Sequence, residues 1–192
     1  MKYFTPKLWI AFQGPRRNAA CRVWDHRFQQ YQENLKRILP MLRPMARRFF
    51  RDAMILHDGT LTRMELGDDI NDIAGRWSRR DIINRRKIRV RFFVLADVVE
   101  RRRIIGNCWY VLEYNRVKRV DVNFPGKLEL FPAGFESNFG DWGYDELTCP
   151  EKGLFRHEIL FSSGATIKID FHDFSFRRKT AKAHKTLHES RP

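Results

Sequence analysis

The sequence has little cysteine and no pattern of cysteines that binds metal. Its three cysteines, Cys21, Cys108 and Cys149, are far apart in the sequence and odd in number. This spacing argues against a disulfide framework and gives no Cys-x-x-Cys metal site. We therefore expect three buried, unreactive thiols.

Long apolar runs and nucleotide-binding motifs are also missing. No stretch approaches the roughly 18–20 apolar residues of a membrane span, and the apolar start at residues 3–12 is too short and too interrupted for a secretory signal. We therefore expect a cytoplasmic protein that does not enter a membrane. The chain has no glycine-rich phosphate loop and no Gly-x-Ser-x-Gly elbow. Nucleotide-dependent and nucleophilic chemistry are unsupported, and no cofactor is expected.

The composition is that of a folded, basic chain. Of 192 residues, 43% are hydrophobic and 14% aromatic, and 37 Lys and Arg against 23 Asp and Glu give a net charge of +14. This length predicts one domain, placed at residues 1–176, followed by a basic, disordered tail at 177–192. The charge favours an anionic partner but does not indicate a fold.

The positive charge is concentrated in three segments. Basic residues outnumber acidic ones by 12 to 2 in residues 1–51, by 11 to 3 in 76–103 and by 6 to 1 in 177–192. Residues 104–176 instead contain 7 basic and 11 acidic residues. Any function of the charge is therefore expected outside this aromatic-rich second half.

Two amphipathic helices are predicted within residues 16–54. Apolar residues recur at three- and four-residue steps over residues 16–39, and again from Leu42 to Ala53. Pro40 ends the first helix, and Pro44 suits the first turn of the second. The pair predicts a helical hairpin with an apolar face to be covered.

From about residue 59 to 176 the period changes to two, which predicts strands. Alternation is clearest at residues 155–161 and 166–171, which flank a Ser-Ser-Gly turn and predict a hairpin. Further strands are expected near residues 60–64, 88–94, 104–112 and 117–124. Strands without intervening helices favour antiparallel pairing. The predicted fold class is α+β, with the N-terminal helical hairpin packed on a mostly antiparallel β-sheet.

The adjacent pair His57 and Asp58 is the first candidate for chemistry. An imidazole beside a carboxylate can bind a metal ion, but such a site needs further ligands from other elements. The favoured interpretation is that Asp58 and Gly59 form a turn while His57 hydrogen-bonds nearby backbone.

A second candidate is the acidic and histidine cluster near the predicted hairpin. Convergence of Asp145, His157 and either Asp170 or His172 would create a site for a divalent ion. Alternation instead places His157 and Glu158 on opposite faces. The favoured interpretation is a half-buried histidine and a Glu158 that pairs across the strands with a residue such as Lys168, so no metal site is assigned.

The third candidate is an arginine-rich surface suited to phosphates or carboxylates. No RNA-recognition motif, zinc finger or recognition helix is present. The expected anion-binding residues are Arg43, Arg47, Arg48, Arg51, Arg79, Arg80, Arg85, Arg86, Lys87, Arg89 and Arg91.

Several motifs resemble a family of uncharacterised bacterial proteins known only as a domain of unknown function. They are the start at residues 1–5, the Leu-His-Asp-Gly junction at 56–59, Trp-Gly-Tyr-Asp-Glu at 142–146 and the segment 157–164. The resemblance spans most of residues 1–176. It implies a bacterial, cytoplasmic, single-domain protein and no particular activity.

The sequence thus favours a non-catalytic binding protein that presents a basic face to an anionic macromolecule, either nucleic acid or an acidic protein. Two alternatives remain open. One is a metal-dependent hydrolase that uses some of His57, Asp58, Asp145, His157 and Asp170. The other is an interaction protein that neutralises a toxin or serves as a subunit of a complex.

Overall fold

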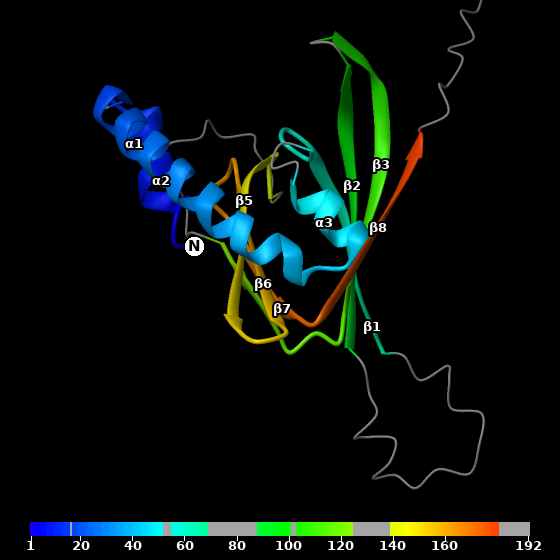
Figure 1. Ribbon diagram of the computed structural model, residues 1–192. Coiled ribbons are helices and arrows are strands. Elements are labelled where there is room, and N and C mark those ends of the chain that lie inside the picture. The colour runs from blue at the N-terminus through cyan, green and yellow to red at the C-terminus, as the bar shows by residue number, and fades with distance from the viewer. Residues whose placement is uncertain (16, 52–54, 69–87, 101–102, 125–138, 181–192) are drawn as a thin grey trace, which may run out of the picture.

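A computed structural model of the chain describes residues 1–15, 17–51, 55–68, 88–100, 103–124 and 139–180 (Figure 1). Within these residues, three α-helices precede eight strands. The helices are α1 (Pro6–Gln13), α2 (Arg17–Ile38) and α3 (Pro44–Arg51), with a short 3-10 helix, η1 (Leu39–Met41), between α2 and α3.

Helix boundaries follow proline and capping residues. The Thr5 hydroxyl accepts a hydrogen bond from the Leu8 backbone N–H at 3.3 Å, and Pro6 occupies the first turn of α1. Pro44 likewise begins α3. The two helices predicted at 16–39 and from residue 42 onward are confirmed as α2 and α3, whereas α1 was not predicted.

The strands form two four-stranded sheets in which every pair is antiparallel. Sheet A has the order β1-β2-β3-β8, and sheet B has the order β4-β7-β6-β5. The strand bounds are β1 Thr60–Asp68, β2 Ile88–Glu100, β3 Arg103–Asn115, β4 Arg119–Asn123, β5 Trp142–Glu151, β6 Leu154–Phe161, β7 Thr166–Phe171 and β8 Asp173–Thr180.

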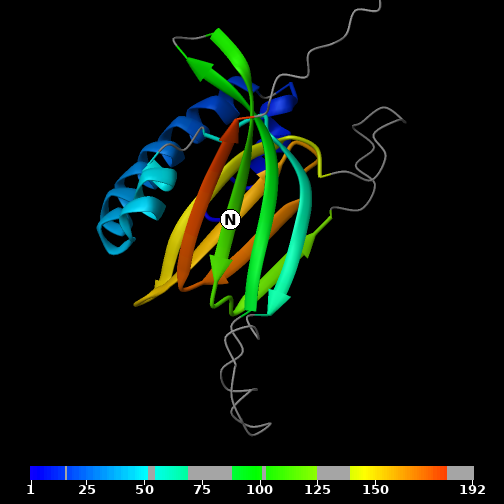
Figure 2. The ribbon, with the colours of Figure 1, turned by 90° about the vertical axis from the view of Figure 1, so that its right-hand side faces the viewer.

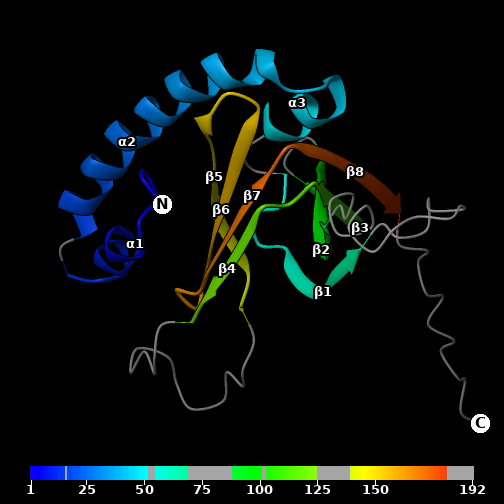
Figure 3. The same cartoon turned by 90° about the horizontal axis from the view of Figure 1, so that it is seen from below.

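The sheets face each other across one apolar core, as the view in Figure 3 shows. Alternate side chains of β2 and β3 enter this core, among them Phe92 and Leu112, which are fully buried. From sheet B, Ile159 and Ile169 are equally buried. The core therefore forms between the inner faces of two sheets, as in other β-sandwiches.

The helices cover sheet B and the open side between the sheets (Figures 1 and 3). Helix α2 lies along β5, where the Tyr31 hydroxyl accepts a hydrogen bond from the Leu147 N–H at 3.0 Å. Helix α3 contacts β8, and Phe50 packs against both Phe174 and His157. The opposite, outer face of sheet A is left without a helix from the described part of the chain (Figure 2).

The predicted α+β class, with N-terminal helices on antiparallel strands, is confirmed. The structure differs in having two sheets where one was expected, and in containing β5 and β8, which were not predicted as strands. Strand β8 continues through Arg177, Arg178 and Lys179 to Thr180. The prediction that the tail begins at residue 177 is therefore wrong for 177–180, and residues 181–192 lie outside the described ones.

Candidate functional site

The outer face of sheet A, which no described helix covers (Figure 2), carries apolar side chains. Because Phe92 and Val94 point into the core, their neighbours in β2 point outward. We call four of the outward residues the sheet-A platform: Phe93, Leu95, Trp109 and Val111. Leu95 pairs in register with Trp109, and Phe93 with Val111. The platform thus spans two adjacent rows of the two central strands.

Trp109 is the most exposed member of the platform. Its exposed fraction is 36%, whereas Phe93, Leu95 and Val111 are half-buried. An exposed indole beside the apolar side chains of Leu95 and Val111 offers a flat aromatic surface to a partner. The platform is therefore the part of sheet A suited to contact through ring faces.

Cations flank the platform on both edge strands. On β1, the Arg63 guanidinium lies 3.9 Å from the centroid of the Phe93 ring, and its Nε is 3.3 Å from a Glu65 carboxylate oxygen. On β8, Arg177 pairs in register with Val111, and Lys179 with Trp109. The side chains of Arg63, Arg177 and Lys179 are exposed. The Phe93–Val111 row thus ends in Arg63 on β1 and Arg177 on β8, whereas the Leu95–Trp109 row ends in Thr60 on β1 and Lys179 on β8.

In the next two rows of the same face, the arginine side chains of β2 are paired with acidic or amide side chains of β3. Arg91 Nε lies 2.7 Å from a Glu113 carboxylate oxygen, and Arg89 Nε donates to Asn115 at 3.2 Å. Burial acts to raise the pKa of Glu113, but the hydrogen bond from Arg91 and the charges of Arg89 and Arg91 outweigh it and lower the pKa. These predicted anion-binding residues already have carboxylate or amide partners.

Four more of the predicted anion-binding residues lie near or in α3, away from the platform. Arg43 forms an ion pair with Asp173 at 3.0 Å. Arg47 donates to the carbonyl oxygens of Leu39, Pro40 and Leu42 at 3.0–3.2 Å, so it stabilises the turn between α2 and α3. The side chains of Arg48 and Arg51 are exposed on α3.

The remaining predicted residues, Arg79, Arg80, Arg85, Arg86 and Lys87, lie outside the described residues. The sequence did not predict the arrangement that the structure shows, namely a platform containing Trp109 with Arg63 on one edge strand and Arg177 and Lys179 on the other. Alternation within residues 104–112 could have placed Trp109 and Val111 on one face. No sequence signal identified that face as the one without a helix.

The pair His57 and Asp58 forms part of a turn. The Gly59 N–H donates to the Leu56 carbonyl at 2.8 Å, and a Cβ atom at Gly59 would lie only 2.8 Å from that oxygen. The predicted turn is confirmed. The Nδ1 of His57 lies 3.0 Å from the Asp58 carboxylate, so the partner of this nitrogen is a side chain and not a backbone group. The ring of His57 also contacts the ring of Tyr144.

His157 lies at the centre of a buried chain of three polar side chains. Its Nδ1 is 2.7 Å from the Tyr114 hydroxyl, and its Nε2 is 2.6 Å from a carboxylate oxygen of Asp145. Tyr114 and His157 are fully buried. Burial raises the pKa of Tyr114 well above its ordinary value, and the charge of Asp145 acts in the same direction. Both ring nitrogens are satisfied, as a structural histidine requires.

The candidate metal ligands are not brought together. Asp145 and His157 meet, but Asp170 pairs with Arg156 on the other face of sheet B, and the Nδ1 of His172 is 2.6 Å from the Gly153 carbonyl oxygen. Over the described ranges, no group of three or more His, Cys, Asp and Glu side chains has metal-binding geometry.

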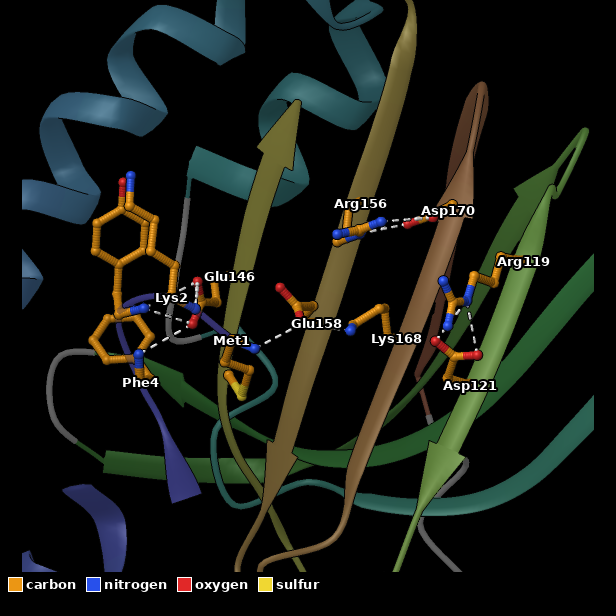
Figure 4. A network of polar contacts seen from close by, with 11 residues as sticks. Met1, Lys2, Phe4, Arg119, Asp121, Glu146, Arg156, Glu158, Lys168 and Asp170 are labelled. Carbon is orange, nitrogen blue, oxygen red and sulfur yellow. Dashed lines mark hydrogen bonds and ion pairs between the residues drawn. The ribbon is translucent and has the colours of Figure 1, made fainter. Parts of the chain in front are cut away.

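The outer face of sheet B is a network of paired charges (Figure 4). Its Glu158 lies opposite to His157, as predicted, and pairs with Lys168 at 3.5 Å and with the terminal amine of Met1 at 2.7 Å. Arg156 donates two hydrogen bonds to Asp170, at 2.7 and 2.9 Å. These charges therefore stabilise the sheet and the N-terminal segment.

Glu146 anchors the first residues of the chain to the same face (Figure 4). Its buried carboxylate accepts hydrogen bonds from the backbone N–H groups of Lys2, Tyr3 and Phe4 at 2.9–3.2 Å. Burial raises the pKa of Glu146 above its ordinary value, although the three N–H groups oppose this effect. The carboxylate is therefore a structural anchor for residues 2–4.

No protein-family model, curated protein or solved structure significantly matches this chain. The resemblance to a bacterial family of unknown function therefore stays a prediction. Among the helices of the described residues, none combines the length and the apolar character needed to cross a membrane.

Proposed function

We propose that this chain is a non-catalytic binding protein whose sheet-A platform binds single-stranded nucleic acid. One observation carries the proposal: the exposed Trp109 adjoins the apolar platform residues Leu95 and Val111, and cations beside the platform lie on both edge strands of sheet A. These cations are Arg63 on β1 and Arg177 and Lys179 on β8.

The chemistry of a single strand fits this arrangement. Unpaired bases stack on exposed aromatic rings, and basic side chains beside the rings contact the phosphates. With strands about 4.8 Å apart, the three steps from β1 to β8 separate the two basic edges by about 14 Å. A single nucleic-acid strand that runs across the sheet from β1 to β8 can place a base over Trp109 and phosphates near Arg63 or Arg177. In a duplex, the base faces are already stacked and unavailable to this surface.

The state of the other polar groups supports a non-catalytic role. His157 and Tyr114 are fully buried, and Asp170 is held by Arg156 in a bidentate pair. A general acid or base must reach its substrate directly or through one water molecule. These groups are suited to structural roles, whereas the platform is open to a partner.

The proposal is tested by titrating labelled single-stranded oligothymidylate and oligouridylate with the protein and following fluorescence anisotropy. Replacing Trp109 with Ala should weaken binding about 5- to 100-fold, since stacking on one aromatic side chain is worth about 1–3 kcal/mol. Arg48→Gln removes an exposed cation from α3, and Arg91→Gln removes a paired one from sheet A. Both controls should bind within about threefold of the wild type.

Competition identifies the class of partner. Excess duplex DNA and poly-glutamate should each compete poorly with the single strand. Equal affinity for poly-glutamate would instead favour an acidic protein as the partner. Failure to bind any single-stranded oligonucleotide, or full affinity in the Trp109→Ala variant, would overturn the proposal.

A further inference from the structure

A cavity of about 540 Å³ lies beside the start of α3, among residues that do not belong to the sheet-A platform. It is bordered by η1 and α3, by the β3–β4 and β5–β6 turns, and by the junction of β7 and β8. Its volume is in the range of sites that bind small molecules. The apolar part of its lining consists of Met41, Leu42, Ala46, Phe155, Phe171 and Phe174.

Basic side chains complete the lining. They are Arg43, Arg116, Lys152 and His172, and Asp173 is the one acidic residue among the lining residues. Arg43 is paired with Asp173 at 3.0 Å, and the Nδ1 of His172 is 2.6 Å from the Gly153 carbonyl oxygen. Within the described part of the chain, Arg116 and Lys152 form no ion pair or side-chain hydrogen bond. Two cations in the lining therefore remain available to a ligand.

Arg116 is also held in an uncommon backbone conformation. Its φ is +52°, in the left-handed region that is unfavourable for a residue with a Cβ atom. The turn that contains it starts at the end of β3, so the side chain is positioned by a short connection between the two sheets. Backbone strain of this kind occurs at ligand-binding positions.

We infer that this cavity binds a small organic anion with an apolar, ring-sized body and a carboxylate, sulfonate or phosphate group. Met41, which is 63% exposed, and the small exposed parts of Phe155 and Phe174 would contact the apolar body, and Arg116 and Lys152 would bind the charged group. A neutral apolar molecule would leave both cations without a partner. An organic cation would be repelled, because the basic lining residues outnumber the acidic one.

The test compares two fluorescent probes with the same rings and different charge, added to the full chain. Anilinonaphthalene sulfonate carries the anionic group, whereas phenylnaphthylamine lacks it. We expect saturable binding of the sulfonate with at least about tenfold higher affinity than the neutral probe, since only the sulfonate can accept charge-assisted hydrogen bonds from the two cations. Ring-current shifts of the Met41 and Ala46 methyl NMR signals should accompany binding and identify the cavity.

Variants separate this site from other apolar surfaces. Arg116→Asn removes the cation and keeps a residue that tolerates positive φ, and Lys152→Gln removes the second cation. Each should weaken sulfonate binding about tenfold and leave the neutral probe unaffected. Lys118→Gln removes an exposed cation from the same turn outside the cavity lining and serves as the matched control. Equal affinity for the two probes, unchanged binding in both cavity variants, or no shift of the two methyl signals would overturn the inference. Because no residue of the platform lines the cavity, failure here would not affect the proposal for Trp109.

Discussion

Asp170 and Asp121 lie on the same face of sheet B, but their ion pairs differ in burial (Figure 4). The Asp170 side chain is 8% exposed, whereas the Asp121 side chain is 38% exposed and its partner Arg119 is 60% exposed. Water screens an exposed pair, so such a pair contributes little to stability. The Arg156–Asp170 pair is therefore expected to be the more stabilising one.

We predict that Asp170→Asn destabilises the protein by about 1.5–3 kcal/mol at neutral pH, the usual range for hydrogen bonds to charged groups. The two hydrogen bonds from Arg156 lower the pKa of Asp170 below its ordinary value of 3.8. The contribution of the Asp170 carboxylate to the free energy of unfolding is thus fully present above pH 3.8. It is lost as the pH falls through the lower pKa that Asp170 has in the folded protein. Urea unfolding from pH 7 to pH 3 should show the difference between variant and wild type shrinking in acid.

Asp121→Asn is the matched control for this prediction. Because the Arg119–Asp121 pair is exposed and screened by water, the change should leave the free energy of unfolding nearly unchanged at any pH. An equal loss of stability in both variants, or a pH-independent loss in Asp170→Asn, would contradict the assignment.

For single residues, the sequence predicted which face of a strand a side chain occupies and which neighbour it pairs with in a hairpin. It did not predict contacts between buried side chains of different sheets. Alternation separated His157 from Glu158 and indicated Lys168 as a partner for Glu158, because neighbours across strands follow from a hairpin register. The contact of His157 with Tyr114 could not be predicted in this way. It joins β6 of one sheet to β3 of the other, and no local pattern encodes the distance between sheets.

At the scale of elements, the N-terminal segment and α2 complete sheet B. Phe4 packs against Trp24 and Tyr31 of α2 and against Tyr144 of β5. Asn34 and Tyr31 also bond to the outer edge of β5 at Leu147. An edge strand with unpaired backbone groups invites aggregation. Helix α2 therefore protects β5 as well as covering apolar side chains.

We predict that Glu146→Gln releases the N-terminal segment from β5. The side-chain amide offers one acceptor oxygen where the carboxylate offers two, so buried N–H groups of residues 2–4 lose partners at a cost of about 1–3 kcal/mol each. The free energy of unfolding should fall by about 2–4 kcal/mol. Hydrogen exchange at Tyr3 and Phe4 should accelerate at least tenfold.

Glu151→Gln, at the exposed end of β5, is the control and should leave stability and exchange nearly unchanged. Slow hydrogen exchange at Tyr3 and Phe4 in the Glu146→Gln variant would show that the apolar contacts of Phe4 alone hold the N-terminal segment on β5. That result would contradict the anchoring role of the carboxylate.

Elements with a clean period could be predicted, and the others could not. The hairpin of β6 and β7 alternates apolar and polar residues, so its position was correct. In β5, the outward Glu146 and the inward Asp145 are both acidic, and a bulge interrupts the register near Gly143. Alternation is therefore lost. In β8, the basic residues Arg177 to Lys179 were assigned to a disordered tail, although they continue the strand formed by the apolar residues before them.

At the scale of the whole molecule, the net charge of +14 does not describe a uniform basic surface. Several arginines have internal partners: Arg47 binds carbonyl oxygens, and Arg91 and Arg156 bind carboxylates. The cations beside the platform come from β1 and β8, which are far apart in the sequence. Their proximity depends on the strand order of sheet A, which hydrophobic periodicity does not specify.

The most direct test of the proposed function is the salt dependence of binding to single-stranded oligothymidylate of about 15 nucleotides. For the wild type, the logarithm of the association constant should fall with the logarithm of salt concentration with a slope of at least about −2, since each phosphate contact contributes about −0.7. The triple variant Arg63→Gln, Arg177→Gln, Lys179→Gln should show a slope shallower by about 2. The same slope in both proteins, or wild-type binding that is insensitive to salt, would contradict binding of nucleic acid by this face of sheet A.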